Sequence, residues 1–136
     1  MKSSLVAGLT HTRRWQIDAG RTIDFMGEDG RVYATPELVR DIEVTCRDFL
    51  LEHLDAGEDS VGTRVAIDHL APTLMGMWVD ITITIAELNG PAVTFAIEAR
   101  DNLDPVAKGS HNRFIVGVEK TKARLLAKAA KVKAAS

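Results

Sequence analysis

Glu43 is an acidic residue within an otherwise apolar helical pattern, which makes it the first candidate for chemistry. Steps of four, three and four residues join Val39, Glu43, Cys46 and Leu50, so all four lie along one face of a helix. Partial burial there prepares a carboxylate to act as a base or a nucleophile. The alternative, and the commoner role, is a carboxylate at the margin of the apolar face that reaches water or a salt-bridge partner.

His69 and Thr35 are the residues that can act with Glu43. His69 alternates with Val65 and Ile67 on the strand side expected to face the helix, so its imidazole and the carboxylate are predicted to converge. Thr35 stands at the predicted helix start, where its hydroxyl can orient water or attack a substrate, or serve only as an N-cap. A rise of roughly 12 Å along the helix separates Thr35 from Glu43 and argues against their direct contact.

Each of these residues also has a purely structural interpretation. An inward histidine is more often a satisfied core or interface residue than a catalyst. The sequence also contains three competing histidines: His11, His53 and His111.

The elements that must position these side chains follow from periodicity. A helix is predicted from Thr35 to about Leu54, with Thr35 as N-cap, Pro36 at the first helical position and Gly57 as the stop. Period-two alternation predicts strands in four regions: Thr10–Asp18, Gly62 to Pro72, Met77–Leu88 with a hairpin at Asn89-Gly90 into Val93–Ile97, and Val106–Val118, where Gly109 and Gly117 are candidate bulges.

One long helix beside a meandering sheet predicts an α+β fold in which the antiparallel sheet wraps around the helix, and the hot-dog fold is the commonest solution. Such sheets usually pair with a second copy, helices side by side. We therefore expect residues 1–136 to form one domain, in which residues 119–136 are a basic C-terminal helix or tail, and we expect a homodimer or a tetramer.

The composition narrows the possible partners. A formal net charge of -2 gives no reason to expect nucleic-acid binding, and no apolar run approaches the roughly 18 residues of a membrane span, so a cytoplasmic protein is expected. Cys46 is the single cysteine, so no internal disulfide forms. The spacing of Cys and His predicts no structural zinc site.

Several motifs together resemble the fluoroacetyl-CoA thioesterase family of hot-dog enzymes, over about Tyr33 to Lys120. The matching stretches are Val32–Thr35, Glu43, Gly57–Thr63, Ile67–Thr73 and Gly109–Arg113. The threonine, glutamate and histidine of the family's catalytic triad match Thr35, Glu43 and His69. The segment Met26–Gly30 departs from the fluoroacetyl-specific member, in which phenylalanines gate the pocket, so the acyl group stays open.

This resemblance implies hydrolysis of a small acyl-CoA thioester within a dimer, with the CoA arm along the subunit interface and no metal or redox cofactor. Glu43 is expected to act as nucleophile or general base, His69 to pass a proton to the thiolate, and Thr35 to position the carbonyl or the water. Backbone N–H groups near Gly62 or the helix start are candidate oxyanion donors. Arg113, with Arg64 and the C-terminal lysines, is a candidate for the CoA phosphates.

Three other functions compete with this hypothesis. A non-catalytic acyl-CoA-binding hot-dog module would keep the groove but tolerate loss of Glu43 or His69. A hot-dog hydratase would need an aspartate and a histidine five residues apart near the helix, and Glu52-His53 lacks that spacing. In a purely structural dimer, the polar residues on the apolar face of the helix would have no catalytic role.

Overall fold

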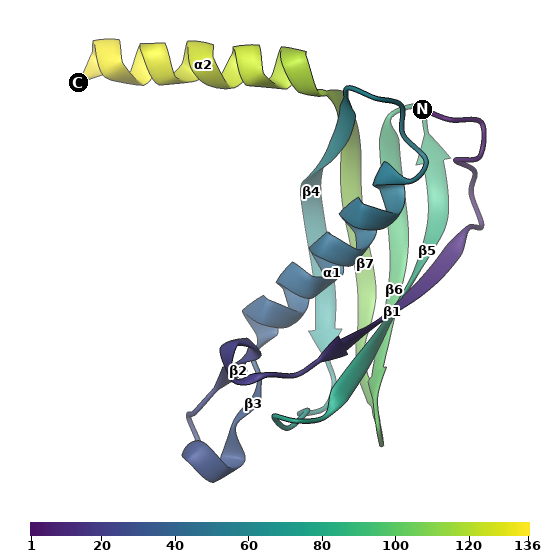
Figure 1. Ribbon diagram of the computed structural model, residues 1–136, viewed down its shortest axis with the longest axis vertical. Helices are drawn as coiled ribbons and strands as arrows, with labels where there is room; N and C mark the ends of the chain where they lie inside the picture. Colours follow the sequence, from purple (N-terminus) through teal and green to yellow (C-terminus); the bar gives the residue numbers. More distant parts are fainter.

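The computed structural model describes all 136 residues, and its main feature is a five-stranded antiparallel sheet curled around one helix, α1 (Figure 1). The sheet has the order β1-β5-β6-β7-β4. Its strands are β1 (Thr10–Gln16), β4 (Glu58–His69), β5 (Trp78–Asn89), β6 (Ala92–Asp101) and β7 (Pro105–Gly117). The α+β architecture and the strand order along the chain agree with the prediction.

Helix α1 spans Thr35–Leu51 and buries the predicted apolar stripe against the sheet. Its fully buried side chains include Leu38, Ile42, Cys46 and Leu50, so the 3.6-residue period identified the core face correctly. The helix ends three residues before the expected Leu54, which still packs in the core. Burial raises the pKa of the Cys46 thiol to about 12, so this cysteine is an uncharged core residue.

Strands β5 and β6 alternate buried and exposed residues, as the sequence predicted for the sheet that covers α1. Their turn is formed by Gly90 and Pro91, one residue beyond the predicted Asn89-Gly90, and Gly90 has a φ of 60° that suits glycine. The predicted bulges at Gly109 and Gly117 are wrong, because the register of β4 with β7 shifts between Gly62 and Arg64 instead. Glycine is required at position 109 for a different reason, because a Cβ there would overlap the backbone of Ala66.

Strand β4 lies at an edge of the sheet, and this corrects one expectation. Val65 was predicted to face the core with Ile67 and His69, yet its side chain is exposed, as is that of Val61. Ile67 packs only partly against the core. The bulge after Gly62 and the missing neighbour beyond the edge leave this strand half covered.

The segment between β1 and α1, for which the sequence predicted no helix or strand, contains short structured pieces. A two-stranded hairpin pairs β2 (Thr22–Ile23) with β3 (Val32–Tyr33). One 3-10 turn, Ala19–Arg21, precedes it, and a second, Glu28–Gly30, lies in the loop between its strands. Strands of two residues are too short to give a periodic signal. The hairpin lies beside the N-terminal end of α1, where Thr35 begins the helix (Figure 1).

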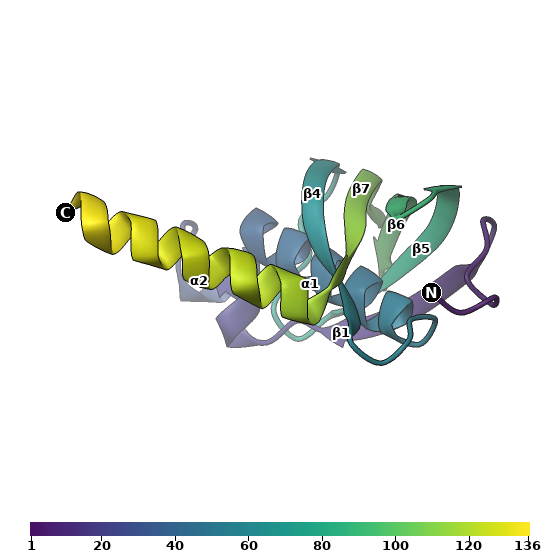
Figure 2. The same cartoon turned by 90° about the horizontal axis from the view of Figure 1, so that it is seen from above.

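The last element, α2 (Val118–Ala135), confirms the predicted basic C-terminal helix. It extends sideways from the end of β7, beyond the strands of the sheet, and none of its residues is buried (Figure 2). No helix in the structure combines the length and the apolar character required to cross a membrane.

Candidate active site

Thr35 and His69 meet at one end of the sheet. Thr35 is the first residue of α1 and His69 is the last residue of β4, and the Thr35 Oγ1 and His69 Nδ1 atoms lie in hydrogen-bond contact at 2.8 Å. The predicted N-cap role of Thr35 is therefore wrong: Ala34 occupies the N-cap, and no side chain caps the helix. Because the N-cap is Ala34, one residue before Thr35, the Thr35 hydroxyl is free to bond with the His69 imidazole.

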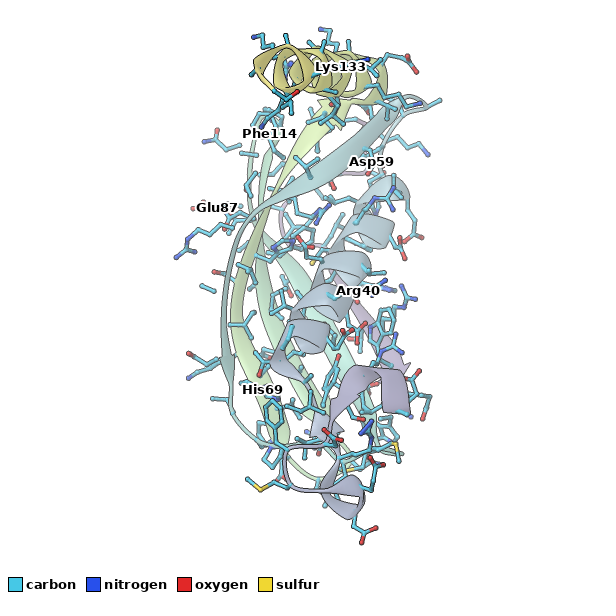
Figure 3. All side chains as sticks on the ribbon, turned by 90° about the vertical axis from the view of Figure 1, so that its left-hand side faces the viewer. Arg40, Asp59, His69, Glu87, Phe114 and Lys133 are labelled. Carbon is cyan, nitrogen blue, oxygen red and sulfur yellow. The ribbon has the colours of Figure 1, made fainter.

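The surroundings of His69 keep its imidazole neutral. Figure 3 shows His69 at the end of β4, near the β2–β3 hairpin. The edge of the Tyr33 ring faces it, with ring centroids 6.4 Å apart. Burial lowers the pKa of His69 below that of an ordinary histidine. Its Nε2 atom is buried and has no hydrogen-bond partner, so only Nδ1 is engaged, by Thr35.

Glu43 lies near the middle of α1, in a different group of residues. Its side chain is 47% exposed, which places it at the margin of the apolar face, as the commoner alternative predicted. Glu43 Oε1 lies 3.6 Å from Arg113 Nη1 and 3.9 Å from His111 Nε2. A Cβ at Gly62 would overlap Oε1, so the carboxylate lies directly against the backbone of β4.

Arg113 and His111 form a buried support beneath Glu43. Arg113 donates from Nε to Ser60 Oγ at 2.8 Å, from Nη2 to the Ser60 carbonyl at 2.9 Å, and from Nη1 to His111 Nε2 at 3.2 Å. His111 Nδ1 donates to the Arg64 carbonyl at 2.8 Å, which fixes its tautomer. Burial lowers the pKa of both Arg113 and His111.

This support changes the expected role of Arg113. Only 5% of its side chain is exposed, so the guanidinium cannot reach the CoA phosphates as predicted and instead holds Glu43. His111 was considered only as a competitor of His69, and its contribution to the Glu43 group was missed. The available signal was its spacing: His111 and Arg113 are two residues apart in β7 and therefore face the same side.

The two groups are separate within one copy of the chain. Thr35 and Glu43 are about 12 Å apart along the helix axis, and Gly62 and His69 are roughly 23 Å apart along β4. The predicted convergence of Glu43 with His69 is therefore absent within a single protomer. Thr35 with His69, and Glu43 with Gly62 and Arg113, form two separate residue groups.

A cavity of about 320 Å³ opens beside the Thr35–His69 pair. Tyr33 contributes to its wall, together with the apolar residues Ile23, Val32, Leu70, Ala71 and Pro72. A second hollow, of about 340 Å³, lies on the outer face of the sheet around Glu98 and Lys108 and contains neither catalytic candidate. The first cavity is the one in which a substrate could meet Thr35 and His69.

Comparison with known proteins places this geometry in a family. The model of the fluoroacetyl-CoA-specific thioesterase family matches residues 17–119. The fluoroacetyl-CoA thioesterase of Streptantibioticus cattleyicolor is 26% identical over 132 residues, which cover 92% of this chain and 95% of that protein. The match includes all the candidate site residues, from Thr35 to Arg113.

Solved structures agree with the sequence comparison. A crystal structure of a point mutant of the fluoroacetyl-CoA-specific thioesterase FlK superposes with a TM-score of 0.85 at 25% identity, covering 93% of this chain and 99% of that one. A thioesterase superfamily member from Thermus thermophilus gives 0.87 at 26% identity, covering 97% and 98%. These neighbours confirm the predicted hot-dog fold. The chain belongs to the fluoroacetyl-CoA-specific thioesterase family, a family of hot-dog thioester hydrolases.

Proposed function

We propose that the protein hydrolyses an acyl-CoA thioester with Thr35, Glu43 and His69, at a site that two copies of the chain complete together. The observation that carries this proposal is the contact of 2.8 Å between Thr35 Oγ1 and His69 Nδ1 beside an apolar cavity. A hydroxyl held by a neutral imidazole is suited to orienting a thioester carbonyl or a water molecule.

In the proposed reaction, the Glu43 carboxylate either takes a proton from the attacking water or attacks the thioester carbon itself. The carbon–sulfur bond then breaks, and neutral His69 first accepts a proton and then passes it to the departing CoA thiolate. That proton comes from the attacking water through protonated Glu43 in the general-base route, and from solvent in the nucleophilic route. If Glu43 is the nucleophile, water subsequently cleaves the acyl–enzyme anhydride. Either route releases the free carboxylic acid and CoA. Thr35 holds the carbonyl or the water in line.

The edge strand β4 supports a composite site. Its free edge and the exposed Val61 and Val65 offer an antiparallel pairing surface to a second copy. With a two-fold axis near Val65 and Ala66, Gly62 of one copy lies close to His69 of the other, because antiparallel partners are symmetric about the axis. Since Glu43 rests against Gly62, such a dimer brings the two residue groups together. The CoA arm would then follow this interface.

The first experiment measures thiol release from acyl-CoA substrates by the wild-type protein, E43Q and H69A. We expect each single variant to lose at least about 100-fold in kcat/KM. The stability of each variant is measured alongside, so that loss of activity is separated from loss of fold.

Mixed dimers then test the composite site. If E43Q and H69A chains are unfolded together and refolded, a mixed dimer has one intact site when Glu43 and His69 come from different copies, and about a quarter of wild-type activity returns. If both residues serve the same site from one chain, every site carries a lesion and no activity returns. Unchanged turnover in both single variants would refute the mechanism itself. Acyl-CoA binding without any thiol release would instead identify a non-catalytic module.

A further inference from the structure

The cavity beside Thr35 and His69 is bounded by hydrocarbon. Its walls are the side chains of Ile23, Val32, Leu70, Ala71 and Pro72 and the ring of Tyr33. No carboxylate, amide, lysine or arginine lines it. His69 is its only basic side chain, and burial lowers the pKa of that imidazole, so the lining carries no charge at neutral pH.

Tyr33 is a rigid part of this wall, and its polar end is already occupied. Its side chain is almost completely buried, and its hydroxyl donates to Asp41 Oδ2 at 2.5 Å. Arg21 Nε donates to the same oxygen at 2.9 Å, and the Tyr33 N–H donates to the Thr73 carbonyl at 2.8 Å. Burial and the hydrogen bond to Asp41 raise the pKa of Tyr33, so the phenol is neutral. The hydroxyl is therefore already occupied by Asp41, and Tyr33 offers no free polar group to a ligand in the cavity.

Arg21 and Arg113 are already paired with other residues of the chain. Arg21 is paired with Asp41 and also with Asp18, at 2.9 Å in each case. Arg113 is buried with Ser60 and His111 in the other residue group. An anionic group that entered this cavity would leave water without gaining a partner, which is unfavourable.

We infer that the acyl group this cavity accepts is uncharged and apolar, and larger than acetyl. This inference rests on the proposed thioesterase function and specifies its substrate class. A space of about 320 Å³ has room for about ten waters, at about 30 Å³ each. An acetyl group, with only three heavy atoms, fills a small part of this space. A propyl, branched or phenyl-bearing chain would fill more of the space and contact more of its apolar wall.

The test compares acetyl-, butyryl-, isovaleryl-, phenylacetyl-, malonyl- and succinyl-CoA by thiol release. Each methylene buried in the cavity is expected to raise kcat/KM about fourfold, so butyryl-CoA should exceed acetyl-CoA by about 15-fold. Succinyl-CoA carries a charge on a chain of the same length as butyryl and should fall at least about 100-fold below butyryl-CoA.

A positive charge placed in the cavity wall should weaken this preference for an uncharged acyl group. Ala71 is only partly buried, so A71R can add a guanidinium to the cavity without filling the core. We expect A71R to lower the butyryl-to-succinyl ratio at least tenfold. Ala86 is exposed on β5 and does not line the cavity, so A86R carries the same added charge and should keep the wild-type ratio.

Dissociation constants for non-hydrolysable thioether analogues of butyryl- and succinyl-CoA provide a second readout. These constants report the preference of the cavity even if no thioester is hydrolysed. Absence of hydrolysis would refute the proposed function and leave the preference of the cavity testable. The inference is overturned if succinyl-CoA is bound and hydrolysed within tenfold of butyryl-CoA, or if acetyl-CoA is the best substrate. It is also overturned if A86R shifts the ratio as much as A71R does.

Discussion

Substituting alanine for Gly62 should remove activity without removing stability. The new Cβ would overlap Glu43 Oε1, while its contacts with His111 Cε1 and Arg113 Nη1, at 3.3 and 3.4 Å, are nearly acceptable. The Glu43 side chain is half exposed and flexible, so it can move away by about 1 Å, and a displacement of that size costs about 100-fold in rate. The backbone at Gly62 is not in the left-handed region, so alanine is expected to stabilise the fold by about 0.4 to 1 kcal/mol.

The assay pairs thiol release with thermal unfolding, and Gly117 supplies the control. Gly117 ends β7 and, like Gly62 in β4, is outside the left-handed region, with a φ of -80°, and a Cβ there would meet nothing within 4 Å. G117A should therefore keep both activity and stability. Wild-type kcat/KM in G62A would show that the carboxylate does not depend on the space above this glycine. A loss of several degrees in its Tm would show that the added Cβ disturbs the fold and not the carboxylate alone.

Two further predictions concern proton and hydrogen-bond chemistry. Because burial lowers the pKa of His69, its neutral form persists below the ordinary value of about 6.5, so kcat/KM should hold at neutral pH and fall only at a more acidic pH. A pH–rate profile checks this, and an acidic limb above pH 7 would contradict it. Asp101 is buried and accepts hydrogen bonds from Thr73 Oγ1 and from the backbone N–H groups of Leu103 and Asp104, each at 2.8 Å. D101A leaves these donors unpaired and should lower the free energy of unfolding by about 3 kcal/mol, measured by urea denaturation. The control is D104A, because the Asp104 carboxylate is exposed. Equal losses in both variants would refute the stabilising role assigned to Asp101.

Periodicity predicted the parts of the fold that depend on one segment at a time. The apolar stripe of α1 and the alternation of β5 and β6 follow from side chains that each element must bury, so their type and core face were predictable. The β2–β3 hairpin was missed because a pair of two-residue strands has no period to detect. Its position is set by tertiary contacts, such as the hydrogen bond from Tyr33 to Asp41.

The candidate site was predictable in its residue types but not in its grouping. Thr35 has an adequate local role as an N-cap, and only the fold shows that its hydroxyl contacts His69 instead. The burial of Arg113 depends on the pairing of β4 with β7, which places Gly62 directly opposite it. The sequence alone does not determine that register, so a guanidinium that supports Glu43 could be mistaken for a ligand of phosphate.

Helix α2 has a consequence for how the molecule responds to its surroundings. A helix of 18 residues that buries none of them is held only by its own backbone hydrogen bonds and the propensities of its alanines and lysines, so it opens far more readily than the sheet. The peptide bonds that follow its many basic residues are then the first that trypsin can cut. Since the core residues lie elsewhere, such clipping leaves the hot-dog domain folded.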